Sequence, residues 1–275
     1  MNIAPSDALS GVVRSMVDTA HGQVQFRSAG MAPQVTHVLL HGIGSASGSW
    51  AYQLSAAASQ PLRVLAWDAP GYGSSSPVQA DWPRADDYAE RLWAWLDALG
   101  VNTPVTLVGH SLGALMAGRA AVLSPQRVQR LVLLAPAGGY GNAEPAVREQ
   151  KLRDRLATLE RLGPQGMAQA RGAAMLSPAA APELVQAVRE SMSQVIPAGY
   201  TQAARLLAHG TLASDLATLR MPLAVASGSA DGITTPAACQ ALAGAAGVPW
   251  NDLGSVGHAC PLEAPGAVNA LLGLN

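Results

Sequence analysis

Short apolar runs alternate with amphipathic stretches along most of the chain, and this pattern predicts the order of its elements. The runs Val35 to Leu40 (VTHVLL) and Arg63 to Trp67 (RVLAW) are β-branched or apolar, and a glycine-rich turn follows each, as expected for buried strands. Similar runs are found at 105–108, 128–135, 222–227 and 248–253. Two further strands, at 14–19 and 23–28, predict a small hairpin at an edge of the sheet.

Apolar residues that recur every three to four positions predict helices between these strands. Such helices are expected over 48–59, 83–99 and 112–123. In the second of them Leu92, Leu96 and Leu99 share one face, and Gly100 ends the helix. Strands that alternate with helices favour a mostly parallel sheet that is covered on both faces, so the chain is expected to belong to the α/β class.

The segment 138–220 breaks this alternation, because no strand is evident in it. Its helical stretches, separated by glycine and proline, are expected at 143–162, 164–176, 181–195 and 200–208. A helical insertion of roughly 80 residues is far longer than an ordinary crossover connection. We therefore predict a first core part at 1–137, a helical cap over the sheet edge at 138–220, and a second core part at 221–275.

Composition and charge narrow the class of protein and its partners. With 49% hydrophobic residues in a chain of 275, a large core can be buried. The 17 basic and 18 acidic residues give a net charge of -1 without a long run of either sign, which argues against nucleic acid as a partner. The start of the chain, MNIAPSDALSGVVRSM, has no basic region followed by an apolar one, and no apolar stretch reaches about 20 residues. A cytoplasmic protein without a membrane partner is expected.

Cysteine usage gives no sign of a disulfide framework or of a metal site. Only Cys239 and Cys260 are present, and no C-x-x-C or His/Cys cluster has the spacing of a zinc site. We therefore expect neither a metal ion nor a cofactor.

The pentapeptide GHSLG at 109–113 joins a predicted strand to a predicted helix. This is the G-x-S-x-G spacing of a nucleophile elbow, in which two glycines leave room for a serine held in a strained turn. The turn directs the hydroxyl outward at the carboxyl end of the sheet, beside the free N–H groups that start the helix. Ser111 is therefore the predicted nucleophile.

A serine hydroxyl needs a base, and one of the six histidines has the right place in the chain. His258 lies between the last predicted strand and a closing helix, at the carboxyl edge where open α/β sheets place their sites. His209 ends a helix beside Gly210, where a histidine commonly interacts with the helix dipole. The others lie in the hairpin, inside a strand or in glycine turns: His21, His37, His41 and His110.

The carboxylate that orients the base must follow a strand end between Ser111 and His258. Asp231 does so in SGSADGITTP, just after the strand at 222–227. Asp252, inside or at the end of the last strand, is the alternative. Because the Asp231 loop can reach the same edge as His258, Asp231 is the predicted acid.

The oxyanion that develops during acyl transfer needs preorganised donors. The backbone N–H of Leu112 starts the helix after the elbow, and that of Ile43 follows His41-Gly42 in the loop after the strand at 35–40. Both are predicted to form an oxyanion hole through backbone atoms alone.

Five motifs now stand in order along the chain: LLHGIG, DAPGYGSS, VGHSLGA, SGSADGITTP and GHACPLEAP. In this order and at these distances they resemble the α/β-hydrolase fold family, in particular its cap-bearing serine hydrolases. The resemblance covers nearly the whole chain and implies an eight-stranded sheet with a triad of Ser111, Asp231 and His258. The serine in the elbow sets the chain apart from haloalkane dehalogenases and epoxide hydrolases, which are similar but attack with an aspartate.

Three functions are compatible with this resemblance. Meta-cleavage product hydrolases, which cut C–C bonds of ring-fission products, are similar in length and cap. They usually carry Pro-Gly after the oxyanion glycines, Asn before the nucleophile and Trp after the histidine, where this chain has Ser45-Ala46, His110 and Ala259. We therefore expect hydrolysis of a carboxylic ester, lactone or thioester in preference to C–C cleavage. A non-catalytic binding protein of the same fold is the third possibility, and the intact triad argues against it.

The predicted cap indicates the kind of substrate. The segment 138–220 is rich in Leu, Met and Ala, and Tyr140 and Tyr200 are its only aromatic residues of the Phe, Tyr and Trp types. A pocket beneath it is expected to be mainly aliphatic, with few fixed polar groups, and to suit a small to medium apolar ester-like molecule.

Overall fold

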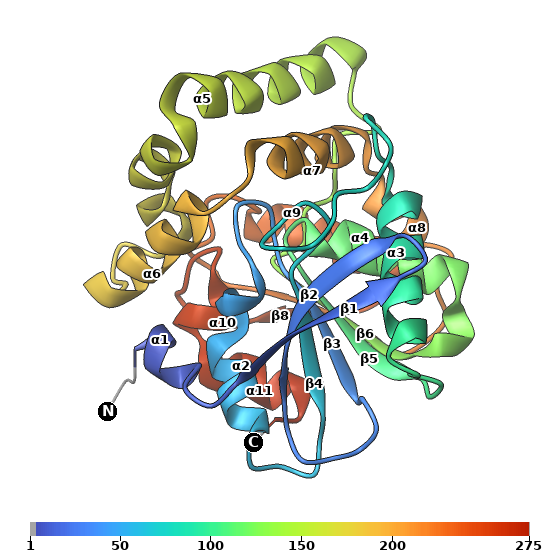
Figure 1. The fold of residues 1–275 in the computed structure, drawn as a ribbon. Coiled ribbons are helices and arrows are strands. Elements are labelled where there is room, and N and C mark those ends of the chain that lie inside the picture. The colour runs from blue at the N-terminus through green and yellow to red at the C-terminus, as the bar shows by residue number, and fades with distance from the viewer. Residues whose placement is uncertain (1–3, 275) are drawn as a thin grey trace.

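Strands and helices alternate along the chain as the apolar pattern predicts. A computed structural model describes residues 4–274 (Figure 1), so that residues 1–3 and 275 of the predicted core parts lie outside the described residues. The strands are β1 (Val13–Thr19), β2 (Gly22–Ala29), β3 (His37–Leu40), β4 (Val64–Trp67), β5 (Val105–His110), β6 (Val128–Leu134), β7 (Leu223–Ser227) and β8 (Trp250–Asp252). The helices of the two predicted core parts are α1 (Pro5–Ala8), α2 (Ala51–Ala57), α3 (Ala85–Ala98), α4 (Gly113–Leu123), α9 (Pro236–Ala246), α10 (Cys260–Glu263) and α11 (Pro265–Leu272), with 3₁₀ turns η1 (Ser47–Trp50) and η2 (Pro125–Arg127).

All eight strands form one sheet, in the order β1-β2-β4-β3-β5-β6-β7-β8. β2 is antiparallel to both β1 and β4, and the strands from β4 to β8 pair in parallel. The predicted edge hairpin and the eight-stranded, mostly parallel sheet are therefore confirmed. Because the carboxyl ends of the parallel strands meet at one edge, the loops that follow them lie close together.

The central strands β3 to β7 are buried along most of their length and contain runs of successive apolar residues, because both faces of the sheet are covered. Val38 and Leu40 pack in the core that contains α3, α4 and α9, whereas Leu39 between them packs in the core that contains α2 and α11. All three leucine or valine side chains are fully buried, and each contributes roughly 1.5–3 kcal/mol relative to an exposed position. The register of a strand therefore decides which of its side chains pack against the helices on each face of the sheet.

The segment 138–220 contains helices, and none of its described residues forms a strand. The helices are α5 (Pro145–Arg171), α6 (Pro182–Ser193), α7 (Pro197–His209) and α8 (Leu212–Leu216), with a 3₁₀ turn η3 (Ala173–Met175). α5, α6 and α7 lie together above the carboxyl edge of the sheet (Figure 1). The predicted break between 162 and 164 is a kink within α5 at Gly163, and α8 is an element that the pattern did not predict. Within residues 4–274, no helix is both long enough and apolar enough to span a bilayer.

Candidate active site

The residues predicted to be catalytic come from three different strand ends. Ser111 directly follows β5, Asp231 lies in the loop after β7, and His258 lies between β8 and α10. The structure brings these three together. It does not bring Asp252 to them: that side chain is exposed and accepts a hydrogen bond from the Gly254 N–H at 2.9 Å.

Ser111 stands in a strained turn between β5 and α4. Its φ angle is 53°, and Ser111 and Ala135 are the only non-glycine residues with a positive φ in residues 4–274. Both glycines of the pentapeptide are needed for steric reasons. A Cβ at Gly109 would lie 2.5 Å from the Gly113 carbonyl oxygen, and a Cβ at Gly113 would overlap the carbonyl oxygen of Leu40. Larger residues would push α4 away from the sheet, and with it the serine.

A continuous chain of hydrogen bonds links the three side chains. The Oγ of Ser111 lies 2.9 Å from Nε2 of His258, and Nδ1 of His258 lies 2.9 Å from Oδ2 of Asp231. A carboxylate only accepts, so Nδ1 carries the proton of the neutral ring and Nε2 is left to accept from the Ser111 hydroxyl. His258 is 5% exposed and Asp231 3%, so water competes little for these bonds. The imidazole is held in the tautomer that a general base requires.

The Asp231 carboxylate is held by its own loop. Oδ1 accepts from the backbone N–H of Ile233 at 2.7 Å and of Thr234 at 3.0 Å, and the Thr234 hydroxyl lies 2.8 Å from Oδ2. Burial by itself raises the pKa of Asp231, but the hydrogen bond and charge of His258, with these loop donors, outweigh it and lower the pKa below its ordinary value. Asp231 is therefore ionised wherever His258 can act as a base.

The loop after β3 lies against the serine. A Cβ at Gly42 would come 2.8 Å from the Cβ of Ser111, so only glycine allows this approach. His41 fixes the loop: its Nδ1 donates to the Gly42 carbonyl at 2.8 Å and its Nε2 accepts from the Ala69 N–H at 2.9 Å. Ile43 and Leu112 both line the cavity in front of Ser111, and their N–H groups form no backbone hydrogen bond in the described chain. Two free donors thus flank the serine.

A second histidine lies beside the first. The rings of His110 and His258 have centroids 5.0 Å apart, and Nε2 of His110 donates to the His258 carbonyl oxygen at 2.8 Å. Burial, and then the nearby His258, lower the pKa of His110 to about 3. His110 is therefore a neutral support for the His258 backbone, and it does not add a positive charge beside the base.

The lowered pKa of His110 predicts the shape of the pH–rate profile. We expect log kcat/KM for an uncharged substrate to rise along the acid limb with a slope no steeper than one and then to level off, because His110 and His41 do not add a second proton to be lost there. His110 stays neutral above about pH 4, and the pKa of the buried His41 is likewise lowered by burial. The measurement is kcat/KM from about pH 4.5 to 9, with circular dichroism at each pH as a check on folding. A limb of slope two would contradict this assignment.

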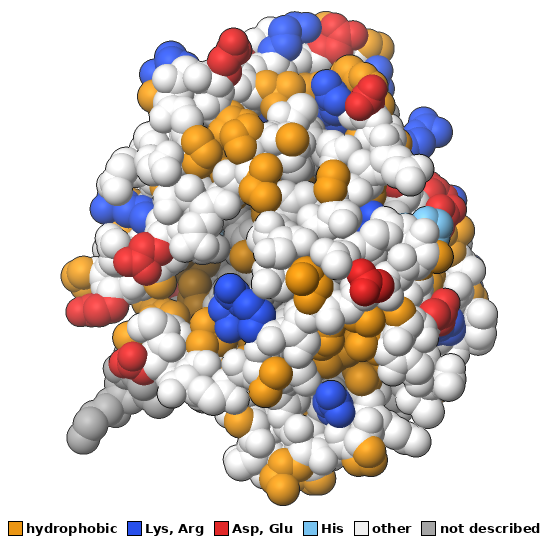
Figure 2. Space-filling model, viewed as in Figure 1, with side chains coloured by type: hydrophobic (Ala, Val, Ile, Leu, Met, Phe, Trp, Pro, Cys, Tyr) orange, Lys and Arg blue, Asp and Glu red, His pale blue; other side chains and the backbone are white. Residues whose placement is uncertain are grey.

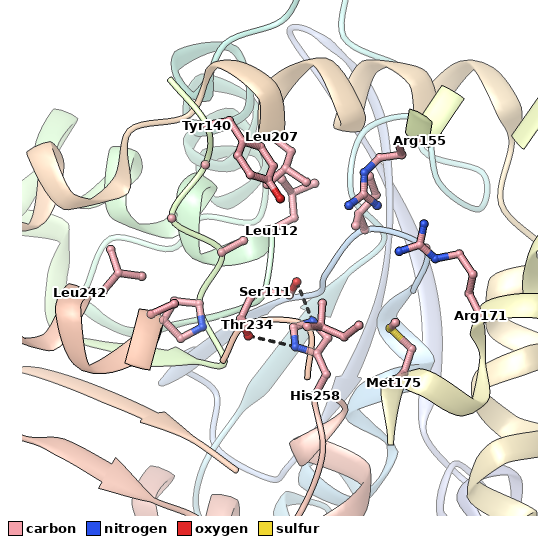
Figure 3. Close-up of a pocket in the computed structure, with 18 of the residues that line it drawn as sticks. Ser111, Leu112, Tyr140, Arg155, Arg171, Met175, Leu207, Thr234, Leu242 and His258 are labelled. Atoms are coloured by element: carbon pink, nitrogen blue, oxygen red, sulfur yellow. Dashed lines mark hydrogen bonds between the residues drawn. The ribbon is translucent and has the colours of Figure 1, made fainter. Parts of the chain in front are cut away.

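A cavity of about 410 Å³ opens in front of Ser111, beneath the helices of segment 138–220 (Figure 3). Most of its lining is apolar, as predicted: Ile43, Leu112, Met167, Met175, Met192, Leu207 and Leu242 among others. One feature departs from the expected aliphatic pocket, since Arg155 and Arg171 also line it. Both come from α5, and the sequence pattern of this helix predicted no role for them.

A second cavity of about 360 Å³ reaches the same serine and histidine from the side of α1 and α6. Its walls combine apolar side chains such as Leu9 and Val188 with Arg14 and Arg27. The face drawn in Figure 2 shows a hollow of this kind, where hydrophobic side chains gather next to basic ones. Ser111 and His258 therefore lie where two cavities meet, so a bound molecule can extend to both sides of them.

Sequence reasoning missed two residues that hold the predicted triad in place. The Thr234 hydroxyl lies 3.1 Å from Nδ1 of His258 and 3.0 Å from the Ala135 carbonyl. The Glu263 carboxylate accepts from the backbone N–H of Gly257 at 2.8 Å and of Ser177 at 3.0 Å, and so ties the His258 loop to segment 138–220. Both stand inside the motifs SGSADGITTP and GHACPLEAP, and a polar residue a few positions from each predicted catalytic residue is the signal that could have found them.

The described residues contain no group of three or more His, Cys, Asp or Glu side chains that could hold a metal ion. What the site offers is a serine with a base, an ionised carboxylate behind the base, and free N–H donors. That set can carry out nucleophilic acyl transfer.

The chain is similar in sequence and in fold to known hydrolases. The chain is 37% identical over 115 residues to a 2-hydroxy-6-oxononadienedioate/2-hydroxy-6-oxononatrienedioate hydrolase of Pseudomonas putida, a match that covers 41% of this chain and 39% of that protein. The chain thus matches only about two fifths of the length of this curated relative. Among solved structures, a hydrolase from Pseudomonas aeruginosa PA01 is 26% identical with a TM-score of 0.80, and covers 94% of this chain and 98% of its own.

An esterase from Thermogutta terrifontis shares the fold at 22% identity, with a TM-score of 0.82, over 95% of this chain and 97% of its own. Residues 38–271 match the Alpha/beta hydrolase family. That stretch contains all but the first residue of β3, the strands β4 to β8, and Ser111, Asp231 and His258. The chain therefore belongs to the alpha/beta hydrolase family, and has its eight-stranded fold.

Proposed function

We propose that this protein is a serine hydrolase that cleaves a carboxylic ester, or a lactone or thioester, through an acyl-enzyme on Ser111. The observation that supports this most strongly is the hydrogen-bonded chain from Ser111 through His258 to Asp231, at 2.9 Å in both steps, which opens into the cavity. The segment 138–220 acts as the cap of this site, because it supplies the cavity wall opposite the sheet edge.

In the proposed reaction, the Oγ of Ser111 attacks the carbonyl carbon of the ester while its proton passes to Nε2 of His258. The backbone N–H groups of Ile43 and Leu112 donate to the oxyanion that forms, and Asp231 stabilises the imidazolium. The C–O bond to the leaving group then breaks, and the leaving oxygen takes the proton from Nε2 and departs as the alcohol.

A water molecule then completes the cycle. Its proton passes to Nε2 of His258 as its oxygen attacks the acyl carbon, and the bond from that carbon to the Ser111 oxygen breaks. The proton returns to Ser111, and the carboxylic acid is released. The same groups serve both halves of the reaction, so no further catalytic residue is needed.

A C–C bond hydrolase acting on a ring-fission product is the second candidate, and the name of the Pseudomonas putida relative favours it. Three positions favour the ester instead. The chain has Ser45-Ala46 after the oxyanion glycines, His110 before the serine and Ala259 after the histidine, in contrast to the residues that such C–C hydrolases usually carry. A binding protein without activity is the third candidate.

A serine-directed probe followed by a substrate panel tests this proposal. A fluorophosphonate is expected to label the wild-type protein once, on the peptide that contains Ser111, and unfolded protein is expected to stay unlabelled. The panel consists of p-nitrophenyl esters of increasing chain length and a ring-fission dienoate. Turnover of the esters with little turnover of the dienoate supports the proposal, and the reverse supports the second candidate. Labelling elsewhere, or no turnover of any of them, counts against a serine hydrolase.

A further inference from the structure

Two arginines face an otherwise apolar cavity in front of the proposed nucleophile. Arg155 and Arg171 line the same 410 Å³ cavity as Ser111 and His258. No aspartate or glutamate is among the described residues that line it. Both residues are only partly buried, and a guanidinium is always charged, so covering it with a bound molecule costs free energy unless an anion or donor–acceptor contacts compensate it. The cavity therefore has positive charge without a counter-charge of its own.

The kink in α5 brings the two side chains to one cavity. Arg155 and Arg171 are 16 positions apart. In a straight helix that spacing puts them about 24 Å apart and roughly 160° around the axis, on nearly opposite sides. At Gly163 the helix has φ 63° and ψ 176°, a conformation that is essentially restricted to glycine, and Pro164 follows. The bend turns both halves of α5 toward the space above Ser111.

Neither guanidinium is neutralised within the described chain. Arg155 donates to the Tyr200 hydroxyl at 3.2 Å, a neutral partner that is 2% exposed and fixes the direction of the arginine. Arg171 makes no ion pair or hydrogen bond with any residue in 4–274. In Figure 3 both guanidinium groups extend toward the cavity in front of Ser111 and His258. Other arginines of the chain, such as Arg119, do have a carboxylate partner.

We propose that Arg155 and Arg171 form a carboxylate-binding subsite, so that the substrate is an ester or lactone with a free carboxylate at some distance from the bond that is cleaved. The planar fork of N–H donors on each arginine matches a carboxylate geometrically, and a carboxylate bound in the cavity supplies the counter-charge that its lining lacks. The apolar lining accepts the hydrocarbon that joins the two ends. This inference deepens the proposed function and rests on it.

Matched pairs of esters test the inference directly. The first pair puts the carboxylate on the acyl side: monoethyl adipate against ethyl hexanoate. The second puts it on the alcohol side: 4-acetoxybenzoate against its methyl ester. A fifth compound, 4-acetoxyphenyl phosphate, carries a phosphate instead. The readout is the ratio of kcat/KM for the charged ester to that for its neutral partner, measured with a pH-stat. We expect this ratio to be at least about 10 in one pair, and the phosphate to be poorer than the carboxylate, because one charge-assisted contact of this kind changes binding by roughly 10- to 100-fold.

Substitutions in the two arginines should remove the preference and leave the chemistry intact. Arg155→Gln and Arg171→Gln are each expected to lower kcat/KM for the preferred charged ester about 10- to 100-fold, mainly by raising KM. The value of kcat/KM for the neutral ester is expected to change less than about threefold. Arg171→Lys keeps the charge without the fork and should retain part of the preference. The matched control is Arg161→Gln, an exposed arginine on the same helix that does not line the cavity, which should retain the wild-type ratio.

Binding to an inactive variant separates this inference from the proposed function. The Ser111→Ala variant is titrated calorimetrically with monoethyl adipate and 4-acetoxybenzoate, and again with Arg171→Gln added. If wild-type protein turns over no ester but this binding depends on Arg171, the proposed function fails and the subsite stands. If the charged and the neutral ester of each pair have equal kcat/KM, the subsite is wrong and the hydrolase stands. The same conclusion follows if the arginine variants lower kcat/KM equally for both members of a pair. A preference for the phosphate would also overturn the carboxylate assignment.

Discussion

Ser111→Ala is expected to lower kcat for any ester that the wild-type protein hydrolyses by about 10⁴-fold or more, as in other serine triads whose nucleophile is removed. The reason is structural. The Oγ of Ser111 is the atom that His258 contacts at 2.9 Å, and the strained turn holds it in front of the cavity. Alanine fits the same turn, so the loss should appear in the rate and not in the fold. The measurement is kcat on the best ester of the panel, together with the melting temperature.

The control for this change is a serine outside the site. Ser193→Ala, at a partly buried position of α6 that lines neither cavity, removes only a hydrogen bond to the Glu190 carbonyl and should leave kcat within about twofold. Residual activity close to wild type in the Ser111 variant would refute the acyl-enzyme mechanism. Loss of activity with an equal loss of folded protein would be a stability effect, and the melting temperature identifies it.

Much of the fold could be predicted from the sequence, because a strand that is buried on both faces has apolar residues at successive positions. β4 and residues 38–40 of β3 are continuous apolar runs, since each strand sits inside a sheet with helices on both sides. The ends of elements were less clear. β5 extends through His110, because its last residues still pair with β6, a tertiary contact that local propensity does not encode. The five-residue α8 is too short to show a helical period.

The residues of the candidate site could be predicted because the loops that follow parallel strands lie at the same edge of the sheet. Ser111, Asp231 and His258 each follow a strand, so one edge of the sheet brings them together whatever their distance in sequence. Arg155 and Arg171 had no such signal. Whether a charged residue on a long helix faces solvent or a cavity depends on the kink at Gly163 and on how α5 packs, and the spacing of the two arginines predicts opposite faces.

Asp231→Asn is expected to lower kcat by about 10⁴-fold, and Asp252→Asn by less than about twofold. An asparagine at 231 can still accept from the N–H groups of Ile233 and Thr234, so the loop keeps its shape. Its amide group, however, can donate to Nδ1 of His258 where the carboxylate only accepts. That favours the tautomer with the proton on Nε2, which then cannot accept the proton of Ser111.

Asp252 is the matched control because it is also an aspartate close to the end of a strand on the same side of the sheet. Its carboxylate is exposed and bonds only to the Gly254 N–H among the described residues, so an amide oxygen can replace it. Both variants are compared by kcat on one ester and by circular dichroism. Because the imidazole in the Asp231 variant lacks a negative partner, raising the pH should not restore its rate to the wild-type plateau. The opposite pattern, a large loss in the Asp252 variant and a small one in the Asp231 variant, would mean that Asp231 is not the acid that orients His258.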